Sequence, residues 1–126
     1  MDDKLKEKLK FCRLPGVVEC YDDVLKEAKD NNLNHEQFFN NLVEHEVIMR
    51  ENNRFNRLLR QAKFPSLKTI EQFNFSDAPF ISKTEVMELF SCKFIDQKTN
   101  VLFLGSPGTG KSHLMVSIGV EACRQG

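Results

Sequence analysis

The sequence contains one loop whose residue types suit the binding of phosphate. Residues 105–112 satisfy the pattern G-x-x-x-x-G-K-[ST] at every specified position. Glycines leave backbone N–H groups open to phosphate oxygens because they carry no Cβ. Lys111 can reach the β- and γ-phosphates, and the Ser112 hydroxyl can ligate Mg²⁺. The pattern predicts a site for a nucleoside triphosphate with Mg²⁺, made of Gly105, Ser106, Pro107, Gly108, Thr109, Gly110, Lys111 and Ser112.

The residues on either side of this loop follow the order of elements that a phosphate loop requires. Residues 101–104 form a short apolar run, Val-Leu-Phe-Leu, typical of a buried parallel strand, and residues 113–125 have the pattern of a helix. A helix that begins near Gly110 adds unpaired N–H groups and the positive end of its dipole. The alternative is a glycine-rich turn that binds nothing, and the flanking segments favour the phosphate site.

Several parts of a complete P-loop nucleotidase have no counterpart that we can identify. Such enzymes use an acidic residue at the end of a second strand to complete the Mg²⁺ site, and an arginine to offset charge in the transition state. One parallel strand is also not a sheet, because its edges stay unpaired. We therefore expect a truncated ATPase domain that binds Mg²⁺-nucleotide weakly or not at all, does not hydrolyse it, and has no assigned catalytic residue.

Helical patterns dominate the sequence before the loop. A first helix carries Leu5, Leu9 and Cys12 on one face and ends at Leu14-Pro15-Gly16. A second spans residues 17–29, with a stripe of Val17, Tyr21, Val24 and Ala28. A third begins after Asn34, which forms a capping box with Gln37, and runs to Phe64-Pro65, with a bend near Asn52-Asn53 as an alternative. A fourth begins after Ser82 and runs through Phe94.

A domain boundary is predicted at Phe64-Pro65-Ser66, because proline stops a helix and the pattern of the chain changes after it. Residues 1–66 would form a helical N-terminal domain, and residues 67–126 the start of a P-loop domain. The fold class is therefore predicted as mainly α, with a helical region followed by the first strand, P-loop and helix of an incomplete α/β domain. We expect four helices, a lone or poorly paired strand at 101–104, and a fifth helix from Lys111 to Cys123.

Composition limits the classes of protein that the chain can represent. It has 126 residues, 18 basic and 18 acidic, so its formal net charge of zero says nothing about partners. No apolar run approaches the roughly 20 residues of a membrane span, and the N-terminus lacks an apolar signal core. The four cysteines form no C-x-x-C pair and are predicted to be buried thiols of a reducing compartment. We expect a soluble, cytoplasmic protein.

Charge is distributed unevenly along the predicted helices. Residues 19–46 hold eight acids and two bases, whereas residues 47–70 hold six bases and one acid. Arg50, Arg54 and Arg57 are spaced i, i+4, i+7 and share one face of the third helix. Such a row can lie along the phosphate backbone of DNA. The alternative is a solvated face that pairs with the acidic helix before it, and the charge pattern alone slightly favours that alternative.

Several segments together resemble the IstB-like transposition helper ATPases, which are relatives of the DnaC-type helicase loaders in the AAA+ class. The resemblance covers essentially the whole chain. The phosphate loop alone would be shared with many nucleotidases, so the other segments carry the family assignment. The segments are Leu14-Pro15-Gly16, Arg50-Glu51-Asn52-Asn53-Arg54, residues 64–73 from Phe-Pro-Ser to Gln-Phe, the loop with its continuation His113-Leu114, and Glu121-Ala-Cys-Arg-Gln-Gly126.

The resemblance implies an ATP-binding protein that uses Mg²⁺, assembles on DNA and assists a transposase. It also implies that the segment from Lys68 to Phe75 lies beside the nucleotide base. With a DNA-bound family behind it, contact of Arg50, Arg54 and Arg57 with DNA phosphates is preferred over the solvated face. The family's second acidic motif, sensor residues and arginine finger have no counterparts in these 126 residues. Two alternatives stay open: a helicase loader in replication, and a non-enzymatic helical DNA-binding module with a vestigial P-loop.

Overall fold

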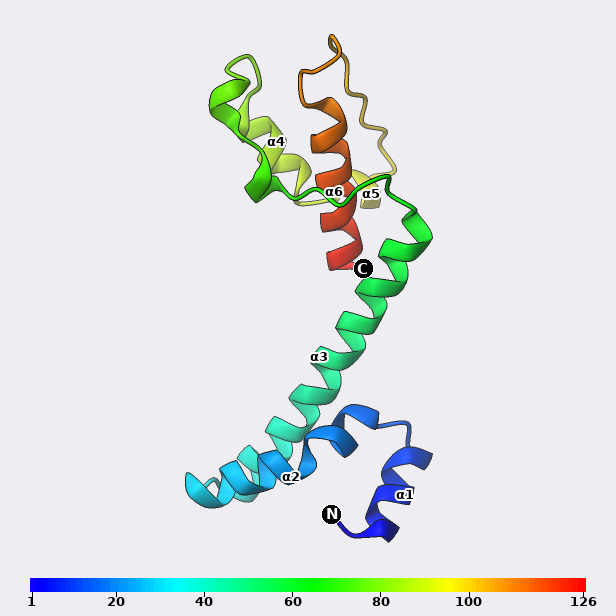
Figure 1. The fold of residues 1–126 in the computed structure, drawn as a ribbon, viewed down its shortest axis with the longest axis vertical. Helices are drawn as coiled ribbons and strands as arrows, with labels where there is room; N and C mark the ends of the chain where they lie inside the picture. The colour runs from blue at the N-terminus through cyan, green and yellow to red at the C-terminus, as the bar shows by residue number, and fades with distance from the viewer. The chain divides into compact units, whose positions relative to one another are not determined.

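A computed structural model describes all residues from Met1 to Gly126. It contains no β-strand, and it divides into two compact units, Met1–Arg54 and Phe55–Gly126 (Figure 1). The mainly α prediction is confirmed. The division predicted at residue 66 stays a prediction. The elements are α1 (Asp3–Phe11), α2 (Pro15–Asp30), α3 (His35–Ala62), the 3₁₀ turns η1 (Ile70–Gln72) and η2 (Phe75–Asp77), α4 (Lys83–Leu89), α5 (Lys93–Asp96) and α6 (Lys111–Gln125).

The first unit is built on a small apolar core between α2 and the first half of α3. Val17, Cys20 and Val24 from α2 are buried together with Leu42 from α3. Val17 and Val24 belong to the predicted apolar stripe of α2, whereas Cys20 is not part of it. Tyr21 and Phe38 pack edge to face beside them, with ring centroids 6.0 Å apart. Leu9 of α1 and Leu14 also pack against this core. The first helix is therefore held by its apolar face.

Helix α3 begins as its sequence predicts. The Asn34 side chain accepts a hydrogen bond from the Gln37 N–H at 2.8 Å, and the Gln37 side chain accepts one from the Asn34 N–H at 2.9 Å. This reciprocal capping box is confirmed. The helix then continues for 28 residues without interruption at Asn52-Asn53. Its residues are shared between the two units, since the first unit ends at Arg54.

The predicted fourth helix is wrong in its length. Ser82 caps α4 by accepting a hydrogen bond from the Glu85 N–H at 3.3 Å, but α4 ends at Leu89. Cys92 then takes a left-handed conformation, with φ of 56°, which a continuing α-helix cannot contain. A separate short helix, α5, follows it. Five α-helices therefore precede the glycine loop instead of the four expected.

The strand expected at 101–104 is not formed. These residues form no strand, and their backbone makes no hydrogen bond to another backbone group. The cause is physical: a strand exists only when a neighbouring strand pairs with it. Leu102 and Leu104 are 79% and 84% exposed, whereas Val101 and Phe103 are partly buried near α6. Burial alternates along these residues as it would in a strand, but no neighbouring strand pairs with them. The α/β part of the fold prediction is therefore not seen.

Helix α6 holds the core of the second unit. Leu114, Val116, Ser117, Ile118 and Val120 are its buried residues. Gly119 lies against the ring of Phe64, so closely that an added Cβ would come within 2.6 Å of the Phe64 Cζ. The helix extends two residues beyond the expected end at Cys123. None of the helices in the chain combines the length and the apolar character that crossing a bilayer demands.

Candidate phosphate-binding site

The glycine loop leads directly into the first turn of α6. Gly110 is the N-cap residue, with φ of 90°, and Gly108 has φ of 78°. Both values lie in the left-handed region, which glycine adopts without steric cost. The space around Gly110 sets a second limit, because a Cβ there would lie 2.7 Å from the Phe73 ring. Glycine is therefore required at position 110 for two separate reasons.

The N-terminus of α6 presents backbone donors without partners. The N–H of Leu114 bonds to the Gly110 carbonyl, but no group of the chain accepts from the N–H of Lys111, Ser112 or His113. Unpaired N–H groups and the helix dipole favour an anion at this end of a helix. The 15 residues of α6 make it long enough to carry a dipole of this kind. This geometry suits phosphate oxygens.

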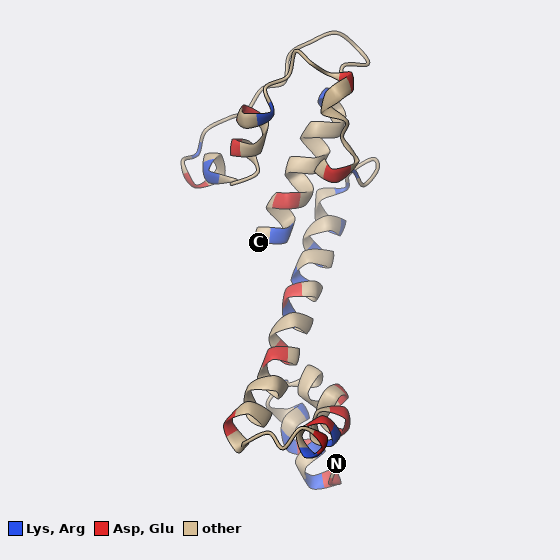
Figure 2. Ribbon diagram, turned by 90° about the vertical axis from the view of Figure 1, so that its left-hand side faces the viewer, with Lys and Arg blue, Asp and Glu red and all other residues tan.

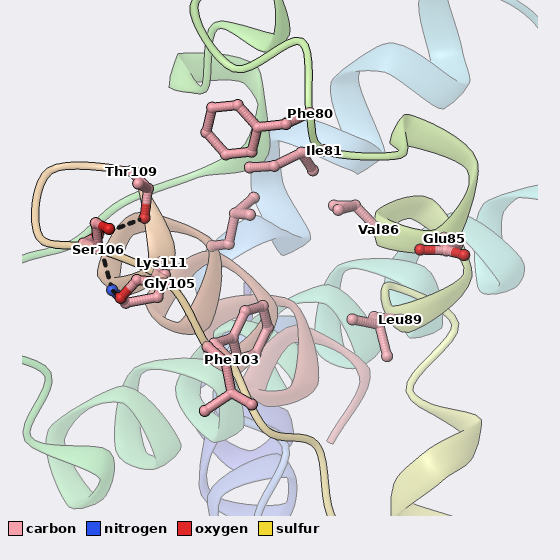
Figure 3. A pocket seen from close by; sticks show the side chains of 12 residues that line it. Phe80, Ile81, Glu85, Val86, Leu89, Phe103, Gly105, Ser106, Thr109 and Lys111 are labelled. Atoms are coloured by element: carbon pink, nitrogen blue, oxygen red, sulfur yellow. Dashed lines mark hydrogen bonds between the residues drawn. The ribbon is translucent and has the colours of Figure 1, made fainter.

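Lys111 lies folded over the loop that precedes it. Its Nζ donates to the carbonyl oxygen of Ser106 at 2.9 Å and also to that of Gly105. The Thr109 hydroxyl donates to the same Ser106 carbonyl at 2.8 Å (Figure 3). No carboxylate forms an ion pair with Lys111. Its charge is therefore not neutralised by the protein, and it remains available to a phosphate group.

Ser112 is the residue of the loop that the sequence pattern assigns to a metal ion. Ser112 is exposed, and its hydroxyl makes no hydrogen bond within the chain. No group of three or more His, Cys, Asp or Glu side chains is arranged to hold a metal ion anywhere in the structure. The residues therefore fit a Mg²⁺ ion that arrives with phosphate oxygens and takes Ser112 as a ligand, and they do not fit an independent metal site.

A cavity of about 550 Å³ lies between the loop and α4 (Figure 3). This size falls within the range of about 300–1,000 Å³ common for small-molecule sites. Its walls are mostly apolar, and Glu85 is the single acidic residue that lines it. Lys111, Thr109 and Ser106 form the polar side. The apolar wall is made of Phe80, Ile81, Val86, Leu89, Phe103, Leu104 and Leu114.

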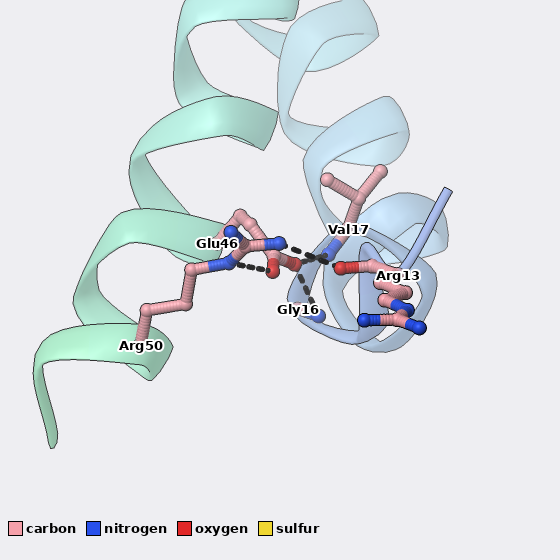
Figure 4. Close-up of polar contacts among 5 residues, drawn as sticks. All are labelled: Arg13, Gly16, Val17, Glu46 and Arg50. Carbon is pink, nitrogen blue, oxygen red and sulfur yellow. Dashed lines mark hydrogen bonds and ion pairs between the residues drawn. The ribbon is translucent and has the colours of Figure 1, made fainter. Parts of the chain in front are cut away.

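The three arginines predicted to contact nucleic acid lie on α3, but they do not share one environment. The Nε of Arg50 bonds to the carboxylate of Glu46 at 2.7 Å, and its Nη2 donates to the Arg13 carbonyl at 2.6 Å (Figure 4). Arg54 and Arg57 are exposed and form no ion pair. Figure 2 marks the basic residues of α3 in blue. Contact with nucleic acid stays a prediction for all three.

Sequence reasoning missed Glu46, which is a buried charge in the first unit. Its carboxylate accepts hydrogen bonds from the N–H groups of Gly16, at 2.7 Å, and Val17, at 3.3 Å (Figure 4). Burial raises the pKa of this carboxyl, but the hydrogen bonds from Arg50 and from the two backbone donors outweigh burial, and the pKa lies below its usual value. Two signals could have found it: Glu46 stands four residues after the core residue Leu42, and α2 lacks an N-cap side chain.

The prediction that all four cysteines are buried free thiols is confirmed only in part. All four are free thiols, in agreement with the absence of paired spacings, and Cys20 and Cys92 are buried. Cys123 is partly buried, and Cys12 is exposed, so the prediction that all four are buried is wrong for Cys12. It is the C-cap residue of α1.

Comparison with known proteins gives the family. The model of the IstB-like ATP binding protein family matches residues 7–126. A protein of insertion sequence IS5376 from Geobacillus stearothermophilus, which its name describes as ATP-binding, is 34% identical over the whole chain and over 50% of its own length. A similarly named protein of insertion sequence IS21 from Pseudomonas aeruginosa is 35% identical over 97% of the chain and 45% of its own length.

The chain belongs to the IstB-like ATP binding protein family. A third relative, from insertion sequence IS232 of Bacillus thuringiensis subsp. berliner, is 30% identical over 97% of the chain. The chain spans about half the length of these curated relatives, between 45% and 50%. The matched region contains the glycine loop, the arginine row and α6.

Proposed function

We propose that the chain binds ATP together with Mg²⁺ at residues 105–112, in a protein that serves DNA transposition. The observation that carries the proposal is the set of unpaired N–H groups at Lys111, Ser112 and His113, next to a lysine without an acidic partner. The family and the names of the relatives, which come from insertion sequences, support ATP as the nucleotide and transposition as the process.

Each residue of the loop has a role that follows from its chemistry. The glycines and the first turn of α6 donate N–H groups to the phosphate oxygens. Lys111 exchanges its bonds to the Gly105 and Ser106 carbonyls for the β- and γ-phosphates, a gain because phosphate is charged and carbonyls are not. Ser112 supplies its hydroxyl to Mg²⁺, which neutralises part of the phosphate charge.

The same proposal includes DNA as a partner through phosphates. Arg54 and Arg57 are exposed, free of ion pairs, and lie on a helix stretch in which bases outnumber acids. Aromatic side chains that stack on single-stranded bases are not interleaved with them on the exposed face, which favours contact with the backbone. A transposase is the protein partner that the insertion-sequence relatives suggest, and self-association on DNA would accompany it.

Binding of a fluorescent ATP analogue to the purified chain, measured by anisotropy in the presence of Mg²⁺, tests the proposal. Lys111→Ala should weaken binding about tenfold or more, because it removes the only side-chain cation of the loop, a change of about 1.4 kcal/mol for each factor of ten. Lys93→Ala, which changes an exposed lysine of α5, should bind like the wild type. Equal affinity of all three proteins would refute the proposed site.

A further inference from the structure

A hydrogen bond joins the first turn of α6 to a segment 44 residues earlier. The Nε2 of His113 lies 2.9 Å from the backbone carbonyl oxygen of Thr69. A carbonyl oxygen only accepts hydrogen bonds, so the Nε2 carries the hydrogen and donates it. The same carbonyl accepts from the Gln72 N–H at 3.2 Å, within η1. Thr69 also begins a capping box with Gln72, which makes this short turn a defined structure.

Phe73, at the end of η1, connects this segment to the glycine loop. Its ring meets the His113 ring edge to face, with centroids 5.3 Å apart, and the Phe75 ring in the same way at 4.9 Å. The Phe73 ring also lies against Gly110, where the absent Cβ leaves the space that the ring fills. Phe73 therefore covers the residue at which the loop becomes α6.

Gly110 is the point at which the direction of the phosphate-facing donors is set. Its left-handed φ of 90° turns the chain into α6, so a rotation there would reorient the N–H groups of Lys111 and Ser112. The Phe73 ring occupies the space that a Cβ on Gly110 would need, and the His113 hydrogen bond ties the first turn of α6 to Thr69. A loop held in its binding conformation loses less entropy when ligand arrives.

We propose that His113 is a positioning residue for the phosphate loop, acting through Thr69 and Phe73 on the backbone of Gly110. The inference rests on the proposed nucleotide binding and adds to it a residue outside the G-x-x-x-x-G-K-[ST] pattern. His113 need not touch the nucleotide. His113 acts by fixing the 69–75 segment. Its effect on affinity should therefore be the same for every ligand that binds the loop through phosphate groups.

Two variants separate the hydrogen bond from the bulk of the side chain. His113→Gln keeps an N–H donor at a length similar to that of Nε2, whereas His113→Leu keeps apolar volume and loses the donor. We expect His113→Leu to weaken binding of both ATP and inorganic tripolyphosphate about five- to tenfold, and His113→Gln to bind both within about twofold of the wild type, by the tenfold-per-1.4 kcal/mol relation. Met115→Leu, at an exposed position of α6, is the control.

The result that would overturn the inference is equal weakening by Leu and Gln, or no weakening by either. Loss of ATP binding with normal tripolyphosphate binding would also overturn it, because that pattern places His113 at the base. Amide hydrogen exchange gives a readout that needs no nucleotide: exchange at Gln72, Phe73 and Leu114, whose N–H groups are hydrogen-bonded to Thr69, Ile70 and Gly110, should be faster in His113→Leu than in His113→Gln. A wild type that binds no nucleotide would refute the proposed function, while this exchange difference would still decide the role of His113.

Discussion

The Glu46 carboxylate accepts a hydrogen bond from the Gly16 N–H at 2.7 Å, across 30 residues of sequence. Helix α2 begins with Leu14 as its N-cap and Pro15 at its first position, so neither residue supplies a capping side chain. A side chain from α3 takes over that role, and Arg50 holds the same carboxylate from the opposite side. The close approach requires glycine, because a Cβ on Gly16 would lie 2.8 Å from the Glu46 Cα.

Removal of this carboxylate should destabilise the first unit. Glu46→Ala leaves the Gly16 and Val17 N–H groups without their partner and Arg50 without its ion pair, a loss of about 3 kcal/mol of unfolding free energy. Urea denaturation followed by circular dichroism measures it. Glu44→Ala, an exposed acid on the same helix with no ion pair, should cost less than about 0.5 kcal/mol. Similar losses in both variants would contradict a special role for Glu46.

The contribution of Glu46 should also depend on pH. Its folded-state pKa lies below the ordinary value of 4.5, so its contribution is fully present above that value and is lost as the pH falls through the folded pKa. The difference in unfolding free energy between wild type and Glu46→Gln should therefore be largest near neutral pH and shrink below pH 4.5. A difference that stays constant down to strongly acidic pH would argue against ionisation as the cause.

Gly119→Ala should destabilise the second unit although alanine is the better helix former. A new Cβ would come within 2.6 Å of the Phe64 Cζ, and relief of that overlap costs about 1–3 kcal/mol. The same substitution in a Phe64→Leu background should recover part of the loss, because the smaller side chain leaves room. Thermal unfolding of the two single variants and the double variant measures this coupling. If the losses of stability in the two single variants simply add in the double variant, then the Phe64 ring is not what excludes a Cβ at position 119.

Arg54→Ala should change how DNA binding depends on salt. Each lost phosphate contact lowers the slope of log K against log salt by about 0.9 for duplex DNA, with little change in sequence preference. Anisotropy titrations of a labelled duplex at several salt concentrations measure the slope. Lys29→Ala, which removes an exposed base of α2, serves as the control. An unchanged slope in a folded Arg54→Ala protein would favour the alternative in which the row is a solvated face.

We expect no steady-state ATP hydrolysis by the chain. Glu85 is the only acid that lines the cavity beside the loop, and no carboxylate pairs with Lys111 or joins Ser112 in a metal site. Phosphate release should equal the background rate of Lys111→Ala in a coupled assay. ATP hydrolysis by the wild type that disappears in Lys111→Ala would contradict this prediction. Loss of that hydrolysis in Glu85→Gln would identify Glu85 as the catalytic acid.

Local signals in the sequence were enough for the features that depend on near neighbours. Asn34 and Gln37 predicted the start of α3, and the glycine pattern of residues 105–112 predicted a loop that leads into a helix near Gly110. Features that depend on distant or missing neighbours were missed or were predicted wrongly. Glu46 caps α2 from a position 30 residues along the chain. Cys92 ends the predicted fourth helix by taking a left-handed conformation, which cysteine does not favour by its residue type.

Residues 101–104 bear on self-association, because they leave an unpaired backbone edge. Their backbone groups are unpaired, and Leu102 and Leu104 present apolar side chains to solvent on one face. An open, apolar edge is a template on which a second chain can add a strand, and six or seven such residues suffice to start ordered aggregation. The segment is shorter than that, and Asn100 and Pro107 limit its extension at either end. Residues 101–104 therefore offer an edge on which a second chain can pair, but one that ends before the length that ordered aggregation requires.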